Sequence, residues 1–176
     1  MLKILKRIKA ALYPVLANPD AWNSLNINYH PPFVERLWLQ MRVDDKPVRV
    51  NLHCIQPCRA EDALFHPHPW PSAMYIYDGE YEMGVGVGEQ IPHPLVAMKM
   101  VGGSGTSYSM IHPDAWHYVR PAGDRPVYTL MVTGTPFPKA ITRPNPSPPK
   151  EPLKELPEER RLELLSIFRD FHSDGG

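Results

Sequence analysis

The middle of the chain carries two histidines two positions apart, in the run His66-Pro67-His68. On an extended strand this spacing directs both imidazoles to the same face, a few ångströms from each other. Two neutral imidazoles side by side make a bidentate start to a metal site. The alternative interpretation is a pair of exposed loop histidines, so a third ligand from a distant strand has to decide between the two.

His117 is the candidate for that third ligand. It follows Pro113-Asp114 and opens a strand-like run that continues through Val119. Together His66, His68 and His117 predict a divalent metal site built from three imidazoles.

Prolines alternate with His66, His68 and Trp70 from position 66 to position 71. Their missing amide donors all fall on one side of an extended segment, so this segment can pair with a neighbour along its other side only. We therefore expect it at a sheet edge or a barrel rim.

The pocket around such a site is predicted from strand phase. Trp70, Ser72, Met74 and Ile76 share the phase of the histidine pair, so they are expected to face the same cavity. They would form either a substrate pocket or simply the core of a barrel. His53 lies on an earlier strand and is predicted as a pocket wall, as a partner of the ligands, or as a satisfied core histidine.

Three other patterns are weaker candidates for a metal or nucleotide site. His112-Pro-Asp114 has the form of a His-x-Asp metal motif, but a Pro-Asp turn explains it better. Cys54 and Cys58 lack the second Cys/His pair of a zinc site, and we expect a core and a loop position for them. The glycines of residues 84–88 lack the spacing of a nucleotide loop and indicate close strand packing.

Composition excludes several classes of protein. The chain has 176 residues, enough for one domain, and 19 Lys and Arg balance 19 Asp and Glu. This balance argues against a nucleic-acid protein that binds through bulk phosphate neutralisation. No apolar run approaches the roughly 20 residues of a membrane span. With two cysteines and no segregated signal sequence at the N-terminus, a cytoplasmic protein is expected.

Residues 1–32 are predicted to form an N-terminal helix and a lead-in. Ile4, Ile8, Ala11 and Val15 recur at helical spacing over residues 1–16, with basic residues mostly off the stripe. We expect this helix to pack on the domain. The alternative is a basic amphipathic helix on an anionic membrane surface.

Residues 33–134 show the period of two that is typical of strands, with Gly and Pro at the breaks. This pattern predicts an all-β sandwich or barrel. The eight expected strands are 33–43, 48–55, 73–77, 81–87, 95–101, 106–111, 116–120 and 127–132.

Residues 135–176 begin with a proline-rich, extended strap and end in a helix. The helix is expected over residues 157–171, with Leu162, Leu165 and Phe168 as its apolar stripe.

The run from Phe65 to Gly79 resembles the first motif of the cupin superfamily, namely His-x-His, a strand and a turn glycine. Residues 105–119 resemble the second motif, with Pro113 before His117, although the spacing is one residue shorter than usual. The resemblance covers residues 33–134. It implies a cupin-like β-barrel, the double-stranded β-helix, with a helix at each end.

One departure from the cupin pattern shapes the functional expectation. Ser72 stands where many cupins have a metal-binding Glu. The chain therefore resembles the three-histidine cupins, which include thiol dioxygenases and β-diketone-cleaving dioxygenases. This resemblance implies a non-haem Fe(II) dioxygenase, an oxidoreductase, with a small, partly apolar substrate.

Two alternatives remain open. The same three histidines suit a Zn- or Mn-dependent isomerase or lyase, with the ion as Lewis acid. The Ser at the Glu position also fits a non-catalytic binding or assembly protein, in which the strap embraces a neighbouring subunit. Cupin barrels often dimerise, so a homodimer is expected by analogy.

Overall fold

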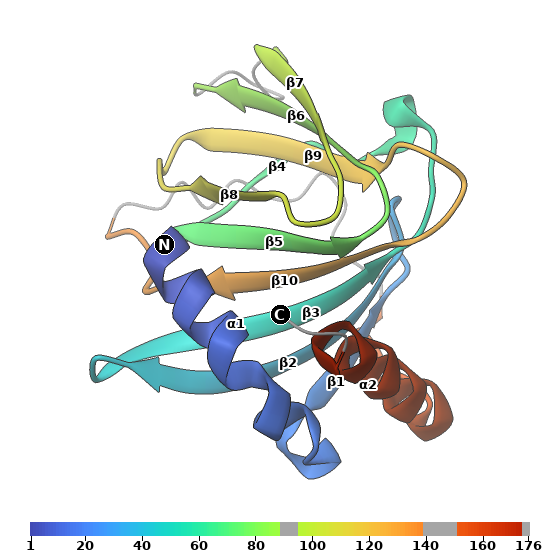
Figure 1. Ribbon diagram of the computed structural model, residues 1–176. Coiled ribbons are helices and arrows are strands. Elements are labelled where there is room, and N and C mark those ends of the chain that lie inside the picture. Colours follow the sequence, from blue (N-terminus) through green and yellow to red (C-terminus); the bar gives the residue numbers. More distant parts are fainter. Residues whose placement is uncertain (89–94, 139–150, 174–176) are drawn as a thin grey trace.

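The computed structural model describes residues 1–88, 95–138 and 151–173. Two antiparallel sheets lie one above the other, and both helices cover the outer side of the larger sheet (Figure 1). The larger sheet has the order β1-β2-β3-β10-β5-β8 and the smaller one β4-β9-β6-β7. The helices are α1 (Leu2–Leu16) and α2 (Glu158–Ser173), with short 3-10 turns at Pro19–Ala21 and Ala60–Asp62. The strands are β1 (Asn23–Ile27), β2 (Val34–Val43), β3 (Lys46–Ile55), β4 (His66–Pro67), β5 (Ser72–Asp78), β6 (Tyr81–Val87), β7 (Met98–Gly102), β8 (Ser107–Met110), β9 (Ala115–Pro121) and β10 (Val127–Thr133).

The predicted fold class, all-β with a helix at each end, is confirmed. Each of the eight expected strands is present, and 81–87 has the expected bounds. The strand expected over 95–101 begins later, at Met98. Besides these eight, β4 carries His66 in the extended segment that was expected at a sheet edge. β1 was not expected; it lies within the predicted lead-in, where five residues alternate too weakly to show a period.

The hairpin of β2 and β3 turns at Asp44 and Asp45, whose φ angles are 50° and 59°. Two consecutive positive φ values match the twist of the flanking strands, and Asp tolerates this conformation better than most residues. The register that follows pairs Arg36 with His53 and Gln40 with Arg49.

One face of this hairpin packs against the two helices, and the other faces the interior between the sheets. Leu37 and Leu39 of β2 belong to the core that lies between the larger sheet and the two helices. The alternating polar residues, of which Arg36 is the central one, therefore point toward the smaller sheet and the interior. This inward face supplies part of the wall of the functional cavity, namely Val34 and Arg36 of β2 and His53 and Ile55 of β3.

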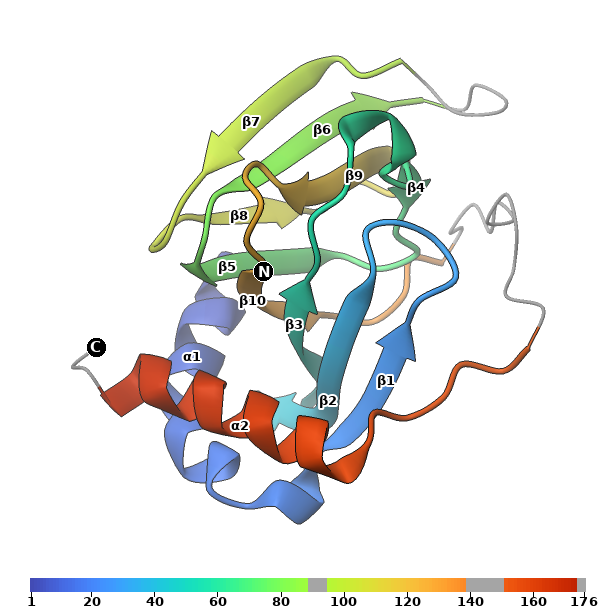
Figure 2. The same cartoon turned by 90° about the vertical axis from the view of Figure 1, so that its right-hand side faces the viewer.

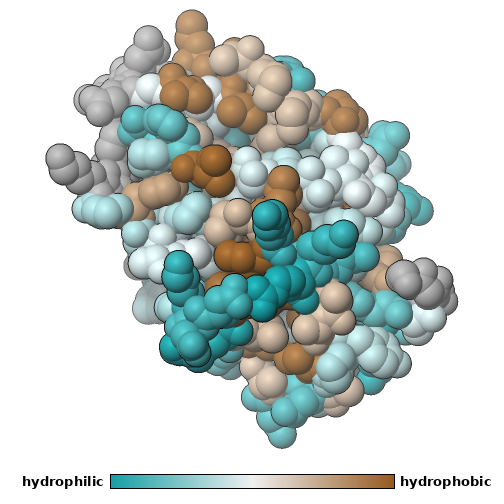
Figure 3. Space-filling model, turned by 60° about the vertical axis from the view of Figure 1, so that its left-hand side comes forward, coloured by the Kyte–Doolittle hydropathy of each residue, from teal (hydrophilic) through white to brown (hydrophobic). Residues whose placement is uncertain are grey.

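Helix α1 packs on the domain as expected, but its buried stripe is rotated from the predicted one. Ala11 is exposed and Ile4 and Val15 are half-buried. The buried residues are Leu5, Ile8, Leu12 and Leu16. In the space-filling view, hydrophilic side chains gather over the middle and lower part of the face where α1 lies, and hydrophobic ones are scattered at the top, toward β7 (Figure 3). The exposed residues of α1 include Lys3, Lys6 and Arg7 beside the apolar Leu2 and Ala11.

Helix α2 lies across the outer side of β1, β2 and β3 (Figure 2). It buries Leu164, Leu165 and Phe168, whereas the predicted stripe residue Leu162 is 41% exposed. Arg160 fixes the helix to β2 through an ion pair with Glu35 at 2.6 Å.

Much of the predicted strap, residues 139–150, lies outside the described residues. Its last part runs beside β1, where Asn26 N donates to Lys154 O at 2.8 Å and Leu156 N donates to Ser24 Oγ at 3.0 Å. In the described part of the chain, neither helix combines the length and apolarity needed to cross a bilayer.

Candidate metal centre

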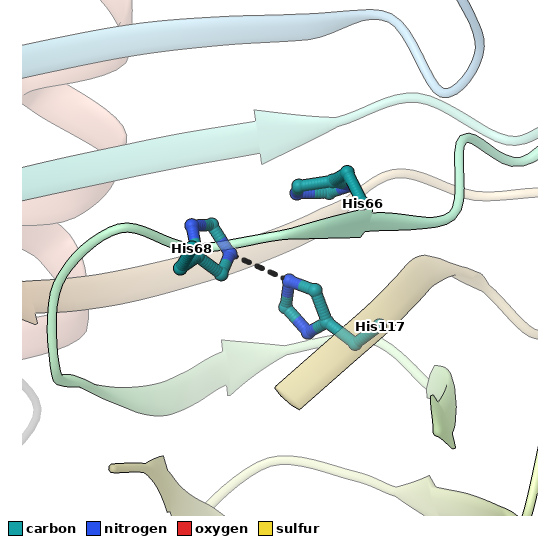
Figure 4. A group of neighbouring side chains, drawn as sticks. All are labelled: His66, His68 and His117. Carbon is teal, nitrogen blue, oxygen red and sulfur yellow. Dashed lines mark hydrogen bonds between the residues drawn. The ribbon is translucent and has the colours of Figure 1, made fainter. Parts of the chain in front are cut away.

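The three predicted histidines come together in the interior between the sheets. β4 is the edge strand of the smaller sheet, as the prolines predict, and it pairs with β9 so that His66 lies opposite His117. His68 follows one residue beyond β4 and turns its ring toward His117 (Figure 4). One ring nitrogen from each histidine lies within 4.8 Å of the others.

The hydrogen bonds of the rings leave the Nε2 atoms directed at one another. His66 Nδ1 donates to the carbonyl oxygen of Leu64 at 2.9 Å, so its Nε2 is left as an acceptor. His117 Nδ1 lies 3.5 Å from Met83 Sδ, and its Nε2 lies 2.7 Å from His68 Nε2. Such bonds to the far nitrogen orient a metal ligand and fix its tautomer.

Burial keeps all three imidazoles neutral at physiological pH. It lowers the pKa of His66 to about 4 and holds the pKa values of His68 and His117 well below their usual range. The neighbouring histidines act in the same direction on His68 and His117, because each disfavours a second positive charge. A neutral imidazole is the form that binds a metal.

To hold one divalent ion, the three nitrogens, which lie within 4.8 Å of one another, have to settle at a common distance from it. Two nitrogens at about 2.1 Å from one ion lie roughly 3.0 Å apart at a right angle and roughly 3.4 Å apart in a tetrahedron. The 2.7 Å between His68 Nε2 and His117 Nε2 has to open by a few tenths of an ångström. Among the described residues, this trio is the group of His, Cys, Asp and Glu side chains that could hold a metal ion. The donor set therefore forms a candidate site for a divalent metal.

A cavity of about 310 Å³ lies against the three histidines. Its walls combine strands of both sheets with residues 29–32, 64 and 69–70 and Leu153 of the C-terminal segment. Of the predicted pocket residues, Trp70, Met74 and His53 line it. Most of the wall is apolar, and its described residues include no Asp or Glu.

Ser72 and Ile76 do not line this cavity, although they share the strand phase of Met74. Ser72 is buried at the start of β5, where it pairs with Thr133 of β10 and Met110 of β8. Ile76 packs with Tyr81 in a separate core cluster. Phase selects the face of a strand, but the cavity spans only part of that face.

Arg36 is a cavity residue that strand patterning did not single out. Its Nε donates to His53 Nε2 at 3.0 Å, and His53 Nδ1 lies 3.3 Å from Thr129 Oγ1. His53 is thus a satisfied buried histidine and a pocket wall at once. Burial, and then the charge of Arg36, hold the pKa of His53 well below its usual range. An isolated Arg in an alternating strand is ordinarily solvent-exposed, so the sequence held no signal for it.

The weaker patterns take the positions that were expected. Cys54 is buried on the helix-facing side of β3 while its neighbour His53 faces the cavity, so they cannot share a zinc ion. Burial raises the pKa of the Cys54 thiol to about 12. His112 accepts from the amide of Asp114 in an exposed turn. A Cβ at Gly84 would lie 2.1 Å from the Tyr118 ring, which confirms close strand packing.

No family model matches the sequence, and no curated protein matches it either. Solved structures are similar at low identity. The Fe(II) form of HppE has 15% identity and a TM-score of 0.50, with 66% of this chain and 58% of that chain covered. The hydroxypropylphosphonic acid epoxidase from S. wedmorenis has 14% identity and a TM-score of 0.48, over 67% and 57%. The oxalate decarboxylase of Lactobacillus farciminis, in a formate complex, has 20% identity and a TM-score of 0.46, over 64% and 32%.

The match at a TM-score of 0.50 decides the fold. The chain has the cupin fold. The cupin resemblance of residues 65–79 and 105–119 is confirmed at that level, with Gly79 at the first motif's turn at a φ of 89°. The chain spans a little over half the length of the HppE and epoxidase chains to which it is similar.

Proposed function

We propose that this protein is a non-haem Fe(II) dioxygenase that acts on a small, partly apolar molecule. The observation that carries the proposal is the convergence of three neutral imidazoles on one wall of a 310 Å³ apolar cavity. When bound there, Fe(II) supplies the redox chemistry with dioxygen. Three protein ligands on one side of the ion leave coordination positions that face the cavity.

The chain's own residues hold and shield this centre. His66 and His117 are fixed across the β4–β9 pair, and the carbonyl of Leu64 holds the His66 ring in its orientation. Met74 and Val119 line the cavity with apolar surface. Such walls exclude water and bury the apolar part of a bound molecule.

The cavity also bears on the Zn- or Mn-dependent isomerase or lyase. Those reactions need a group that moves a proton, and the described wall contains no carboxylate. Both nitrogens of His53 are engaged, which leaves His30, half-buried with Nδ1 3.1 Å from the Pro31 carbonyl, as the imidazole available for that role. This scarcity of bases favours the dioxygenase.

Nitric oxide tests the proposal without knowledge of the substrate, because it binds Fe(II) at an open position where dioxygen would bind. The protein loaded with Fe(II) under anaerobic conditions is expected to give a high-spin iron–nitrosyl EPR signal on addition of nitric oxide. The signal should be lost in His66→Ala and kept in the exposed control His112→Ala. Fe(II) that binds without a nitrosyl signal would contradict the proposal, as would oxygen uptake no faster than that of the Zn(II)-loaded protein across a panel of small acids, thiols and diketones.

A further inference from the structure

A half-buried positive charge lies in the wall of the metal-site cavity. Arg36 projects from β2 into the interior, and burial, followed by the nearby charge of Arg49, lowers its pKa to about 10. The guanidinium therefore stays protonated at neutral pH. Its Nε donates to His53, which orients the group and leaves its two terminal nitrogens as the remaining donors.

No acidic side chain neutralises Arg36 within the described parts of the chain. None of the ion pairs there includes it. The three imidazoles of the metal site are neutral or positively charged groups, so they supply no negative charge either. Partial burial of a cation without a counter-charge costs free energy, which a ligand that supplies that charge would offset.

A second cavity of about 270 Å³ adjoins the first, and Arg36, Trp70 and Met131 line both. Arg49 lines the second cavity together with polar side chains, among them Asn51. The Nε of Arg49 and the indole Nε1 of Trp70 are buried donors without a hydrogen-bond partner in the described structure. Buried donors in native proteins are nearly always paired, so these two point to a missing acceptor.

We propose that Arg36, Arg49 and the Trp70 indole N–H bind an oxyanion of the substrate, whose apolar part then lies against His66, His68 and His117. The inference rests on the proposed function and deepens it, because it names the substrate as a small carboxylate or phosphonate with an apolar body. Carboxylates and phosphonates both present two oxygens to one guanidinium group, which can donate a hydrogen bond to each of them.

The geometry assigns distinct roles to the two arginines. Arg36 stands at the junction of the cavities, held by His53, and is the residue that fixes the distance from anion to metal site. Arg49 stacks on the ring of Trp38, with its guanidinium carbon 4.1 Å from the ring centroid, and closes the far side of the anion site. An apolar chain of a few carbons reaches from there toward Met74 and Val119 in the first cavity.

Isothermal titration calorimetry with two matched pairs of probes tests the inference on the full chain. The first pair is butyrate and its neutral isostere butyramide, and the second is propylphosphonate and 1-butanol. Both anions are expected to bind at least tenfold more tightly than their neutral partners. The ratio of butyrate to propylphosphonate affinity then tells which oxyanion the site prefers.

Arginine variants test whether the anions bind at the proposed site. Arg36→Gln and Arg49→Gln should each weaken anion binding about ten- to hundredfold, which is the loss of one charge-assisted hydrogen-bonding group. Arg36→Lys keeps the charge and covers the case in which Arg36→Gln fails to fold, and it should weaken binding less. Arg59→Gln is the matched control, because Arg59 is a surface arginine with a 72% exposed side chain.

The contribution of a bound metal to anion affinity has to be distinguished from that of the arginines, since an open metal position also attracts anions. Each titration is therefore repeated on protein stripped of metal, with metal content measured in parallel. Anion binding that depends on Arg36 in the metal-free protein supports the inference, even if no metal can be loaded and the proposed function fails. Equal affinity for butyrate and butyramide, or anion binding that vanishes with the metal and is unchanged in Arg36→Gln, would overturn it.

Discussion

Four histidines that are buried or half-buried make the metal-free protein sensitive to mild acid. Burial lowers the pKa of His66 to about 4 and holds those of His53, His68 and His117 well below the usual 6.5. The unfolded chain therefore binds protons more tightly than the folded one below pH 6.5. The free energy of unfolding should be highest above pH 6.5 and fall as the pH drops from there toward 4.

The size of the effect follows from the two pKa values. For one histidine with a pKa near 6.5 unfolded and about 4 folded, the loss is roughly 1.4 kcal/mol at pH 5.5. The pKa values of His53, His68 and His117 are also lowered, so these groups add to the loss in the same direction. The metal-free protein is thus expected to lose more stability between pH 7.5 and 5.5 than His66 alone accounts for.

Urea titrations followed by tryptophan fluorescence measure this loss, because the chain has four tryptophans. The midpoint should fall between pH 7.5 and 5.5 with an unchanged slope. His53→Gln should reduce the pH dependence, and His112→Gln, at an imidazole 61% exposed, is the surface control. A loss below about 1 kcal/mol over this range would refute the reasoning, since the imidazoles would then not be buried and neutral.

Three further substitutions test the packing around the site. Gly84→Ala should lower stability by about 1–3 kcal/mol, because its methyl group displaces the Tyr118 ring; an unchanged melting temperature would contradict this close approach. Phe168→Ala should cost about 3–5 kcal/mol in urea unfolding, since the ring is fully buried under the larger sheet, and a cost below 1 kcal/mol would place α2 elsewhere. Glu82→Gln breaks a half-buried 2.8 Å ion pair with Arg120 and should cost about 2 kcal/mol, without changing metal content.

The histidine site was accessible to sequence reasoning because its signals are local. The i, i+2 spacing of His66 and His68 sets a common face, and the prolines between and after them restrict the segment to an edge. The strand that carries His117 has a period of two and begins after a turn. Pairing these two elements needed the cupin resemblance, since no local pattern states which distant strands become neighbours.

The charged part of the cavity was not accessible in the same way. Arg36 and the residues in its phase have the pattern of a solvent-facing strand edge, and the helices on the outer side of the sheet turn that face inward. Likewise Ile76 has the correct phase but lies beyond the cavity. In α1 the apolar residues cover a wide arc, and packing against the sheet, which the sequence does not show, selects the stripe that contains Leu5 over the one that contains Ala11.

The most direct test of the central claim is metal content by ICP-MS on tag-free protein after anaerobic reconstitution with Fe(II). The wild type and His112→Ala are expected to hold close to one ion per chain. His66→Ala and His117→Ala should each lose the ion while remaining folded by circular dichroism. A wild type that takes up no metal, or ligand variants that keep it, would contradict a metal centre at His66, His68 and His117.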